Sequence, residues 1–131
     1  MTIHELAELI RREKEWEFED GEKSVAFTIP TEGSRTHRVR LAEFRNENVV
    51  FVRFTSTIGT ADGIDQRRTL SALGLNAHLV VGAVAIFHDE LLLTETLPLS
   101  MIEPRAAILV ISYLAQQADR YESVMFGEDN Q

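Results

Sequence analysis

The sequence predicts a single α+β domain in which helices pack against an antiparallel sheet. Apolar residues recur at helical spacing near both ends of the chain, and they alternate with polar residues over residues 16–57. The length of 131 residues allows one domain to bury its own core without metal or disulfide support. The predicted order over residues 1–126 is helix, four-stranded meander, helix, β-hairpin and helix, followed by a disordered tail at 127–131.

A first helix is predicted over residues 2–13. Thr2 followed by Glu5 is the pattern of a capping box, which satisfies backbone N–H groups at a helix start. The apolar residues follow the i, i+3, i+4, i+7 spacing of an amphipathic helix, at Ile3, Leu6, Ala7 and Ile10. The period then changes to two, because Trp16 and Phe18 alternate with glutamates. This change predicts a half-buried strand.

The following strands are predicted to form a meander that has one apolar face. Turns at 21–22 and 46–47 and a loop at 31–35 keep the apolar residues opposite one another. The predicted opposed pairs are Phe18 with Val25, Trp16 with Phe27, Phe27 with Val39, Val25 with Leu41, Ile29 with His37, Leu41 with Val52 and Val39 with Phe54. One face of the meander is therefore apolar from end to end.

The opposite face of the third hairpin is mixed in character. Its predicted opposed pairs are Phe44 with Val49, Ala42 with Phe51, and Arg40 with Arg53. Like charges directly across a strand pair are unfavourable unless an acidic group lies over them. Either an acidic strand or helix of the same chain covers the arginines, or this face receives a partner protein. The candidate contacts for a partner are Phe44, Val49, Phe51 and Arg53.

The second half of the chain predicts a helix, a hairpin and a last helix. Asp62 is expected to cap a helix that runs to about residue 75, with Asn76 at its C-terminal end. Apolar runs at 80–87 and 91–97 predict a second, more deeply buried hairpin. Pro104 opens the last helix. The main apolar stripe of this helix comprises Ala107, Val110, Ile111, Leu114, Ala118, Tyr121 and Met125. Its first half is apolar on all sides, so a second copy of the chain can supply part of its cover.

Motifs for catalysis, cofactor binding and metal binding are missing from the sequence. The chain has no cysteine, no phosphate-binding loop, no G-x-S-x-G and no H-E-x-x-H. The four histidines are scattered over different predicted elements, so neither a metal, a cofactor nor an enzymatic activity is expected. The net charge of −8 disfavours binding to nucleic acid or to an anionic membrane. Because no segment is long and apolar enough to cross a bilayer, we expect a cytoplasmic protein.

Short motifs in the second half of the chain suggest a family. They are LSALGLN at 70–76, GAVAI at 82–86, LLL at 91–93 and LPL at 97–99. These segments resemble the leucine-rich helix ending in asparagine, the hairpin and the entry to the last helix of the YbjN-like family, which has the type III secretion chaperone-like fold. The turn at 88–90 departs from the family, whose hairpins often carry a glycine there. The resemblance implies a domain that dimerises and binds other polypeptides, and it brings no catalytic residues.

The leading functional hypothesis is therefore a homodimeric, non-catalytic module that holds a partner polypeptide. Such a module would add a strand to a sheet edge or pack the partner into a groove. The alternative is a small-molecule-sensing or enzymatic domain whose pocket lies between the last helix and the sheet. That alternative requires convergent polar groups, whereas the predicted inward positions are almost all apolar.

Overall fold

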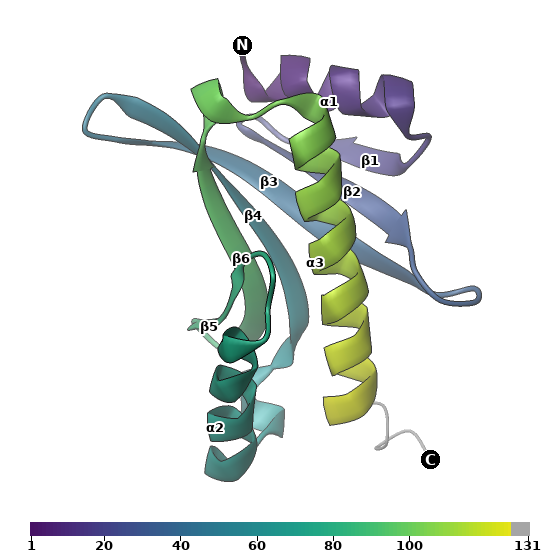
Figure 1. Cartoon of the computed structure of the whole chain (residues 1–131), viewed down its shortest axis with the longest axis vertical. Coiled ribbons are helices and arrows are strands. Elements are labelled where there is room, and N and C mark those ends of the chain that lie inside the picture. Colours follow the sequence, from purple (N-terminus) through teal and green to yellow (C-terminus); the bar gives the residue numbers. More distant parts are fainter. Residues whose placement is uncertain (127–131) are drawn as a thin grey trace.

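A six-stranded antiparallel sheet with the order β1-β2-β3-β4-β6-β5 forms the centre of the computed structural model, which describes residues 1–126 (Figure 1). The strands are β1 (Glu17–Asp20), β2 (Ser24–Pro30), β3 (Thr36–Asn46), β4 (Val49–Thr60), β5 (Ala83–Phe87) and β6 (Glu90–Pro98). The helices are α1 (Ile3–Glu13), α2 (Gln66–Gly74) and α3 (Pro104–Met125), with short 3₁₀ turns η1 (Ala61–Gly63), η2 (Leu75–Ala77) and η3 (Leu99–Met101). The predicted α+β class and element order are confirmed. The tail predicted at 127–131 lies outside the described residues.

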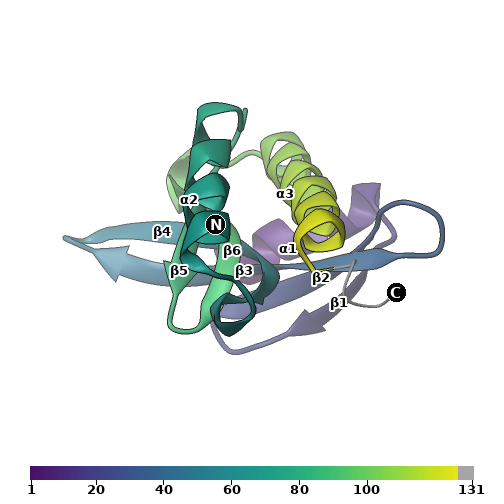
Figure 2. The same ribbon diagram turned by 90° about the horizontal axis from the view of Figure 1, so that it is seen from below.

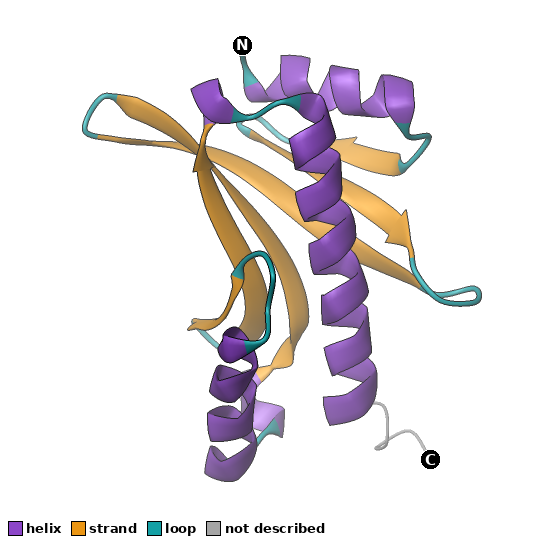
Figure 3. Ribbon diagram, viewed as in Figure 1, coloured by secondary structure: helices purple, strands orange, loops and turns teal. Residues whose placement is uncertain are grey.

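The helices α1 and α3 lie on the same face of the sheet, and Figure 2 shows both of them above the strands. No helix of residues 1–126 covers the opposite face, which we call the outer face (Figure 3). The core fills the space between these two helices and the sheet. Its largest fully buried side chains are Phe27, Phe54, Ile3, Leu6, Ile10, Leu41, Ile58, Leu91, Leu93, Ile111, Leu114 and Val25. The prediction that the meander has one continuous apolar face is therefore confirmed.

The two terminal helices begin where the sequence indicates, and the middle helix does not. The Thr2 hydroxyl accepts a hydrogen bond from the Glu5 N–H, and the Glu5 carboxylate accepts one from the Thr2 N–H. The helix α3 begins at Pro104 as predicted. The predicted cap of α2 is wrong: Asp65 accepts the hydrogen bond at the helix start, because Asp62 lies inside the 3₁₀ turn η1. None of the described helices has the length and apolarity needed to span a bilayer.

The β2–β3 register is as predicted, whereas the β1–β2 register is shifted by two residues. Phe18 pairs with Phe27 and not with Val25, because the β1–β2 ladder ends at the pair Asp20 and Val25, which has four residues between its members in place of the predicted two. Trp16 precedes β1, and its ring meets the edge of the Phe27 ring with centroids 5.9 Å apart. Since side chains alternate with a period of two, this shift leaves Phe18 on its predicted face.

The β3–β4 register is also shifted by two residues. Leu41 pairs with Phe54 and not with Val52. The turn consists of Glu47 and Asn48, whose φ angles of 50° and 70° are those of the type I′ turn that suits the twist of a hairpin. The turn therefore lies one residue later than predicted, and the apolar face is again preserved.

The second hairpin is only partly as buried as predicted. The strand β6 lies inside the sheet, but β5 is an edge strand whose Ile86 and Phe87 are 46% and 62% exposed. The side chain of Asn76 covers this edge. Its Oδ1 accepts a hydrogen bond from the Val84 N–H at 2.5 Å, and its amide nitrogen donates to the Val84 carbonyl at 3.4 Å. Asn76 thus takes the place of a neighbouring strand at the middle of β5.

Candidate functional site

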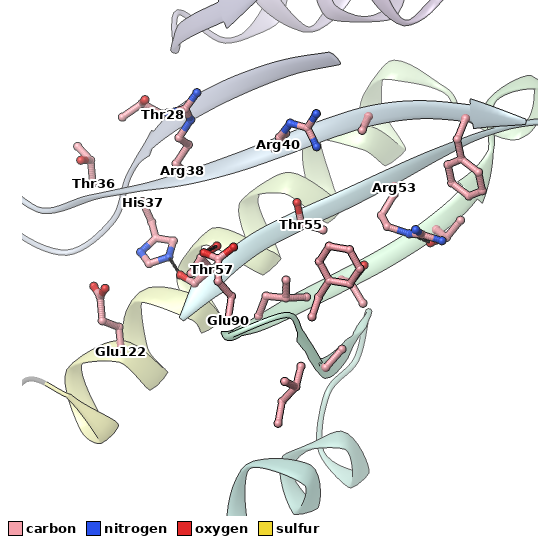
Figure 4. A pocket seen from close by; sticks show the side chains of 18 residues that line it. Thr28, Thr36, His37, Arg38, Arg40, Arg53, Thr55, Thr57, Glu90 and Glu122 are labelled. Carbon is pink, nitrogen blue, oxygen red and sulfur yellow. Dashed lines mark hydrogen bonds between the residues drawn. The ribbon is translucent and has the colours of Figure 1, made fainter. Parts of the chain in front are cut away.

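The outer face of the sheet is hollowed into a groove of about 1050 Å³, which we call the outer groove. It runs over side chains that point outward from β2, β3, β4, β6 and β5 (Figure 4). The strand β4 pairs with β3 over Val49–Thr55 and with β6 over Phe51–Thr60, and a bulge between Thr57 and Gly59 bends and twists it. Threonines from four strands line the groove together with charged and apolar side chains.

Three arginines line one side of the outer groove, and they do not face one another as predicted. Because of the register shift, Arg40 is opposite Thr55 and not opposite Arg53. Arg38 lies 3.3 Å from the Glu19 carboxylate of β1, but the two side chains are 61% and 77% exposed, so Glu19 pairs with this arginine without covering it. Arg40 forms no ion pair with any residue of the described chain, and it leaves a positive charge in the groove.

The predicted contact residues Phe44, Phe51 and Arg53 lie together on the outer face. The rings of Phe44 and Phe51 are stacked, with centroids 5.7 Å apart and planes at 21°. The Arg53 guanidinium lies 4.5 Å above the Phe44 ring and donates a hydrogen bond to the Thr96 hydroxyl at 3.3 Å. Phe44 and Arg53 line the groove, whereas Phe51 does not line it and stacks on Phe44 from the neighbouring strand. Val49 is separate, because it lies beside the hairpin turn and is 43% exposed.

An apolar wall on β5 and β6 faces these arginines across the outer groove. Its members are Ala85, Ile86, Phe87 and Leu92. Phe87 is 62% exposed, whereas aromatic side chains are usually buried for most of their surface. The groove therefore offers cations along one side and apolar surface along the other.

A polar cluster closes one end of the outer groove, where β3 begins and α3 ends (Figure 4). Asp119 is 4% exposed, and its Oδ2 accepts two hydrogen bonds from Arg35 at 2.8 and 3.1 Å. His37 is 9% exposed, with Nε2 2.7 Å from the Thr57 carbonyl oxygen and Nδ1 3.7 Å from Oδ1 of Asp119. Ligand atoms of His37, Asp119 and Glu122 all lie within 4.8 Å of one another.

Opposing effects determine the charge of Asp119. Burial raises the pKa of its carboxyl group, but the hydrogen bonds and the positive charge of Arg35 outweigh burial and hold this pKa below its ordinary value. The same ion pair raises the pKa of Arg35. Asp119 is therefore an ionised carboxylate at neutral pH, even though almost no part of it touches solvent.

The sequence did not predict that His37, Asp119 and Glu122 meet. His37 was placed correctly opposite Ile29, but the approach of α3 to the start of β3 depends on tertiary packing. One signal was available in the sequence. Asp119 directly follows Ala118 of the apolar stripe, and a carboxylate beside a buried helix face needs a partner inside the fold.

Comparisons with known proteins leave the functional assignment to the geometry. The chain matches no known family model, and no curated protein resembles it significantly. The contact between α3 and the sheet is filled by buried apolar side chains such as Val110, Ile111 and Leu114. The outer groove lies on the other face of the sheet, so it is not the pocket that the alternative hypothesis places beneath α3.

Proposed function

We propose that this domain is a non-catalytic protein-binding module with a type III secretion chaperone-like architecture, similar to YbjN-like proteins. In this proposal the outer groove holds an extended segment of a partner polypeptide that carries both acidic and apolar residues. The observation that supports it is the presence of unpaired positive charge and uncovered apolar surface on opposite sides of one open groove. An extended segment presents alternate side chains in opposite directions, so it can meet both sides at once.

Packing into the groove is favoured over strand addition because both sheet edges are protected. At the β5 edge, Asn76 already occupies the backbone groups of Val84. At the other edge, β1 is only four residues long and carries Glu17, Glu19 and Asp20. Short, charged edge strands are poor templates for another strand. A partner segment therefore gains more from the side chains of the outer face than from a free edge.

An acidic partner is compatible with the net charge of −8, because charges in physiological salt are screened beyond about 8 Å. Within that distance, a segment in the groove meets Arg40 and Arg53, whereas Glu90 and Glu122 lie toward the His37 end, where Arg38 is paired with Glu19. Attraction in the groove is thus local. We expect the affinity to fall as salt is added, because each exposed pair contributes only modestly.

The proposal includes a homodimer in the cytoplasm. Leu109 on α3 and Met101 in η3 are 61% and 75% exposed, and both belong to the helical layer and not to the outer face. A second copy that covers this layer leaves the outer groove open for the partner. Sedimentation velocity of the wild-type chain and of Leu109→Glu measures this directly. We expect a dimer for the wild type and a monomer for the variant, and a monomeric wild type refutes the dimer.

Binding is tested with two fluorescent peptides of about ten residues, a length that spans about 33 Å when extended. One alternates aspartate with phenylalanine, and the other has lysine in place of aspartate. We expect fluorescence anisotropy to show saturable binding of the acidic peptide only. Arg40→Glu and Phe51→Glu are expected to weaken that binding at least about tenfold, which corresponds to about 1.4 kcal/mol.

Arg105→Glu is the matched control for Arg40→Glu, because it makes the same charge change at an exposed position at the start of α3, away from the groove. It should bind the acidic peptide like the wild type. Equal binding of both peptides, or equal losses in Arg40→Glu and Arg105→Glu, contradicts recognition by the groove. An affinity purification from the native cell then identifies the partner, whose bound segment should contain acidic and apolar residues.

A further inference from the structure

The polar cluster at the end of the outer groove has the composition and layout of a metal site. His37 comes from the start of β3, and Asp119 and Glu122 lie three residues apart on one face of α3. The nearest ligand atoms of these three side chains all lie within 4.8 Å of one another. His37 and Glu122 also line the groove, so the cluster can be reached from solvent.

The hydrogen bond between His37 and Thr57 determines which ring nitrogen of His37 carries no hydrogen. Nε2 lies 2.7 Å from the carbonyl oxygen of Thr57, and a carbonyl can only accept, so Nε2 carries the hydrogen. In the neutral ring, Nδ1 is then an unprotonated nitrogen whose lone pair is aimed at Asp119. A histidine that donates one ring N–H to a backbone carbonyl and offers the other nitrogen is the usual arrangement of a metal ligand.

The separation between His37 Nδ1 and Asp119 Oδ1 indicates that a cation belongs between them. With Nδ1 unprotonated, both atoms are electron-pair donors that can only accept a hydrogen bond, and their distance of 3.7 Å is too long for one. Two ligands of a tetrahedral ion with bonds of about 2.0–2.1 Å lie about 3.4 Å apart, close to the separation found here. The side chain of His37 is 8% exposed, so this unpartnered nitrogen is held in place by its surroundings.

Arg35 orients the carboxylate of Asp119 and limits the charge of the site. It occupies Oδ2 through two hydrogen bonds, which leaves Oδ1 directed at His37. The two carboxylates and the guanidinium sum to a single negative charge. A divalent cation can therefore bind without burying a large excess of charge of either sign. An imidazole with carboxylates favours Zn²⁺ over Mg²⁺ or Ca²⁺, which prefer oxygen ligands only.

We propose that His37, Asp119 and Glu122 bind one Zn²⁺ ion at the end of the outer groove. The ion takes Nδ1 of His37, Oδ1 of Asp119 and a carboxylate oxygen of Glu122, and water completes a tetrahedral shell on the groove side. Sequence spacing alone gave no sign of this site, because His37 on β3 is far in the sequence from Asp119 and Glu122 on α3. The proposal stands apart from peptide binding, since it requires no partner protein.

The test uses the full chain, stripped of metal with a chelator and titrated with Zn²⁺ in a calorimeter. We expect one ion per chain, a rise in the midpoint of thermal unfolding, and reversal of both by the chelator. Co²⁺ in place of Zn²⁺ should give the visible absorption of a tetrahedral site. The ring nitrogens of His37, followed by NMR, should show metal bound at Nδ1.

Glu122→Gln is the decisive variant, because Glu122 is exposed and its loss leaves the core intact. It should weaken Zn²⁺ binding at least about tenfold. Glu103→Gln, at the exposed start of α3, and His4→Gln, which removes the exposed histidine beside Asp20, should bind like the wild type. The proposal is overturned by an absence of saturable binding. It is equally overturned if Glu122→Gln keeps full affinity, or if His4→Gln loses it.

Discussion

Gly82 joins the loop after α2 to β5, and replacing it with alanine is expected to cost about 2–5 kcal/mol of unfolding free energy. Its φ of +79° is in the left-handed region, where a side chain costs roughly 1–2 kcal/mol. A Cβ at this position would also lie 2.9 Å from the Thr94 carbonyl oxygen of β6 and 3.0 Å from a Leu114 methyl of α3. Forcing atoms into such a packed site typically costs about 1–3 kcal/mol more.

Gly33→Ala separates the two contributions. Gly33 has a similar φ of +62°, but a Cβ there meets nothing within 4 Å, so only the backbone cost of roughly 1–2 kcal/mol applies. Both variants are compared with the wild type by urea unfolding at equilibrium. We expect Gly82→Ala to lose about 1–3 kcal/mol more than Gly33→Ala, with similar dependence on urea. Equal losses would show that β5 can move away from β6 and α3 freely, which would refute the close approach described above.

Three further variants test the core, the sheet edge and the first helix. Leu114→Ala should lose about 2–5 kcal/mol in the same urea experiment, since Leu114 is fully buried, and a loss below about 1 kcal/mol would place it outside the core. Asn76→Ala should lose only about 1 kcal/mol, because Asn76 is exposed and water can take the place of its amide at Val84, but sedimentation should show added association through the uncovered β5 edge. No change in association would mean that Asn76 does not protect this edge. His4 donates a hydrogen bond to the Glu22 carbonyl, and this bond raises the pKa of the His4 imidazole above its ordinary value of 6.5. The bond therefore stabilises the fold fully below about pH 6.5, and this stabilisation is lost as the pH rises through the higher pKa of the folded state. His4→Gln should remove this part of the pH dependence of stability. An NMR titration that gives His4 a pKa of 6.5 or less contradicts the prediction.

The sequence predicted the faces of the strands better than their exact pairing. Alternation with a period of two determines which side of the sheet a residue such as Phe18 or Leu41 faces. It says nothing about a shift by two residues, which preserves the faces and changes only the connecting turn. The β3–β4 turn is the clearest case, since Asn46 and Asn48 are both suited to tight turns and leave the position of the turn open by one residue. The type I′ turn at 47–48 suits the twist of the two strands. In the resulting register Arg40 and Arg53 are not opposite each other.

The candidate site was predictable only where it lies on a single hairpin. Phe44, Phe51 and Arg53 were predicted as contacts because outward residues of adjacent strands must be neighbours. Whether a partner binds them is still a prediction. The apolar wall on β5 and β6 was not anticipated as part of the same surface, because no local pattern specifies that β6 pairs with β4. The cluster at His37 and Asp119 depends on that pairing and on the docking of α3.

Among residues 1–126, the pairing of β4 with β6 is the only strand contact that connects the meander to the second hairpin. The arginines of the outer groove belong to the meander, and its apolar wall belongs to the hairpin. A polypeptide lying across the groove therefore contacts both sides of this junction. Because it binds only while the meander and the hairpin are joined, it slows their separation by mass action. The rate at which the hairpin detaches, followed by hydrogen exchange at the β6 amides, should consequently report how much of the protein is occupied.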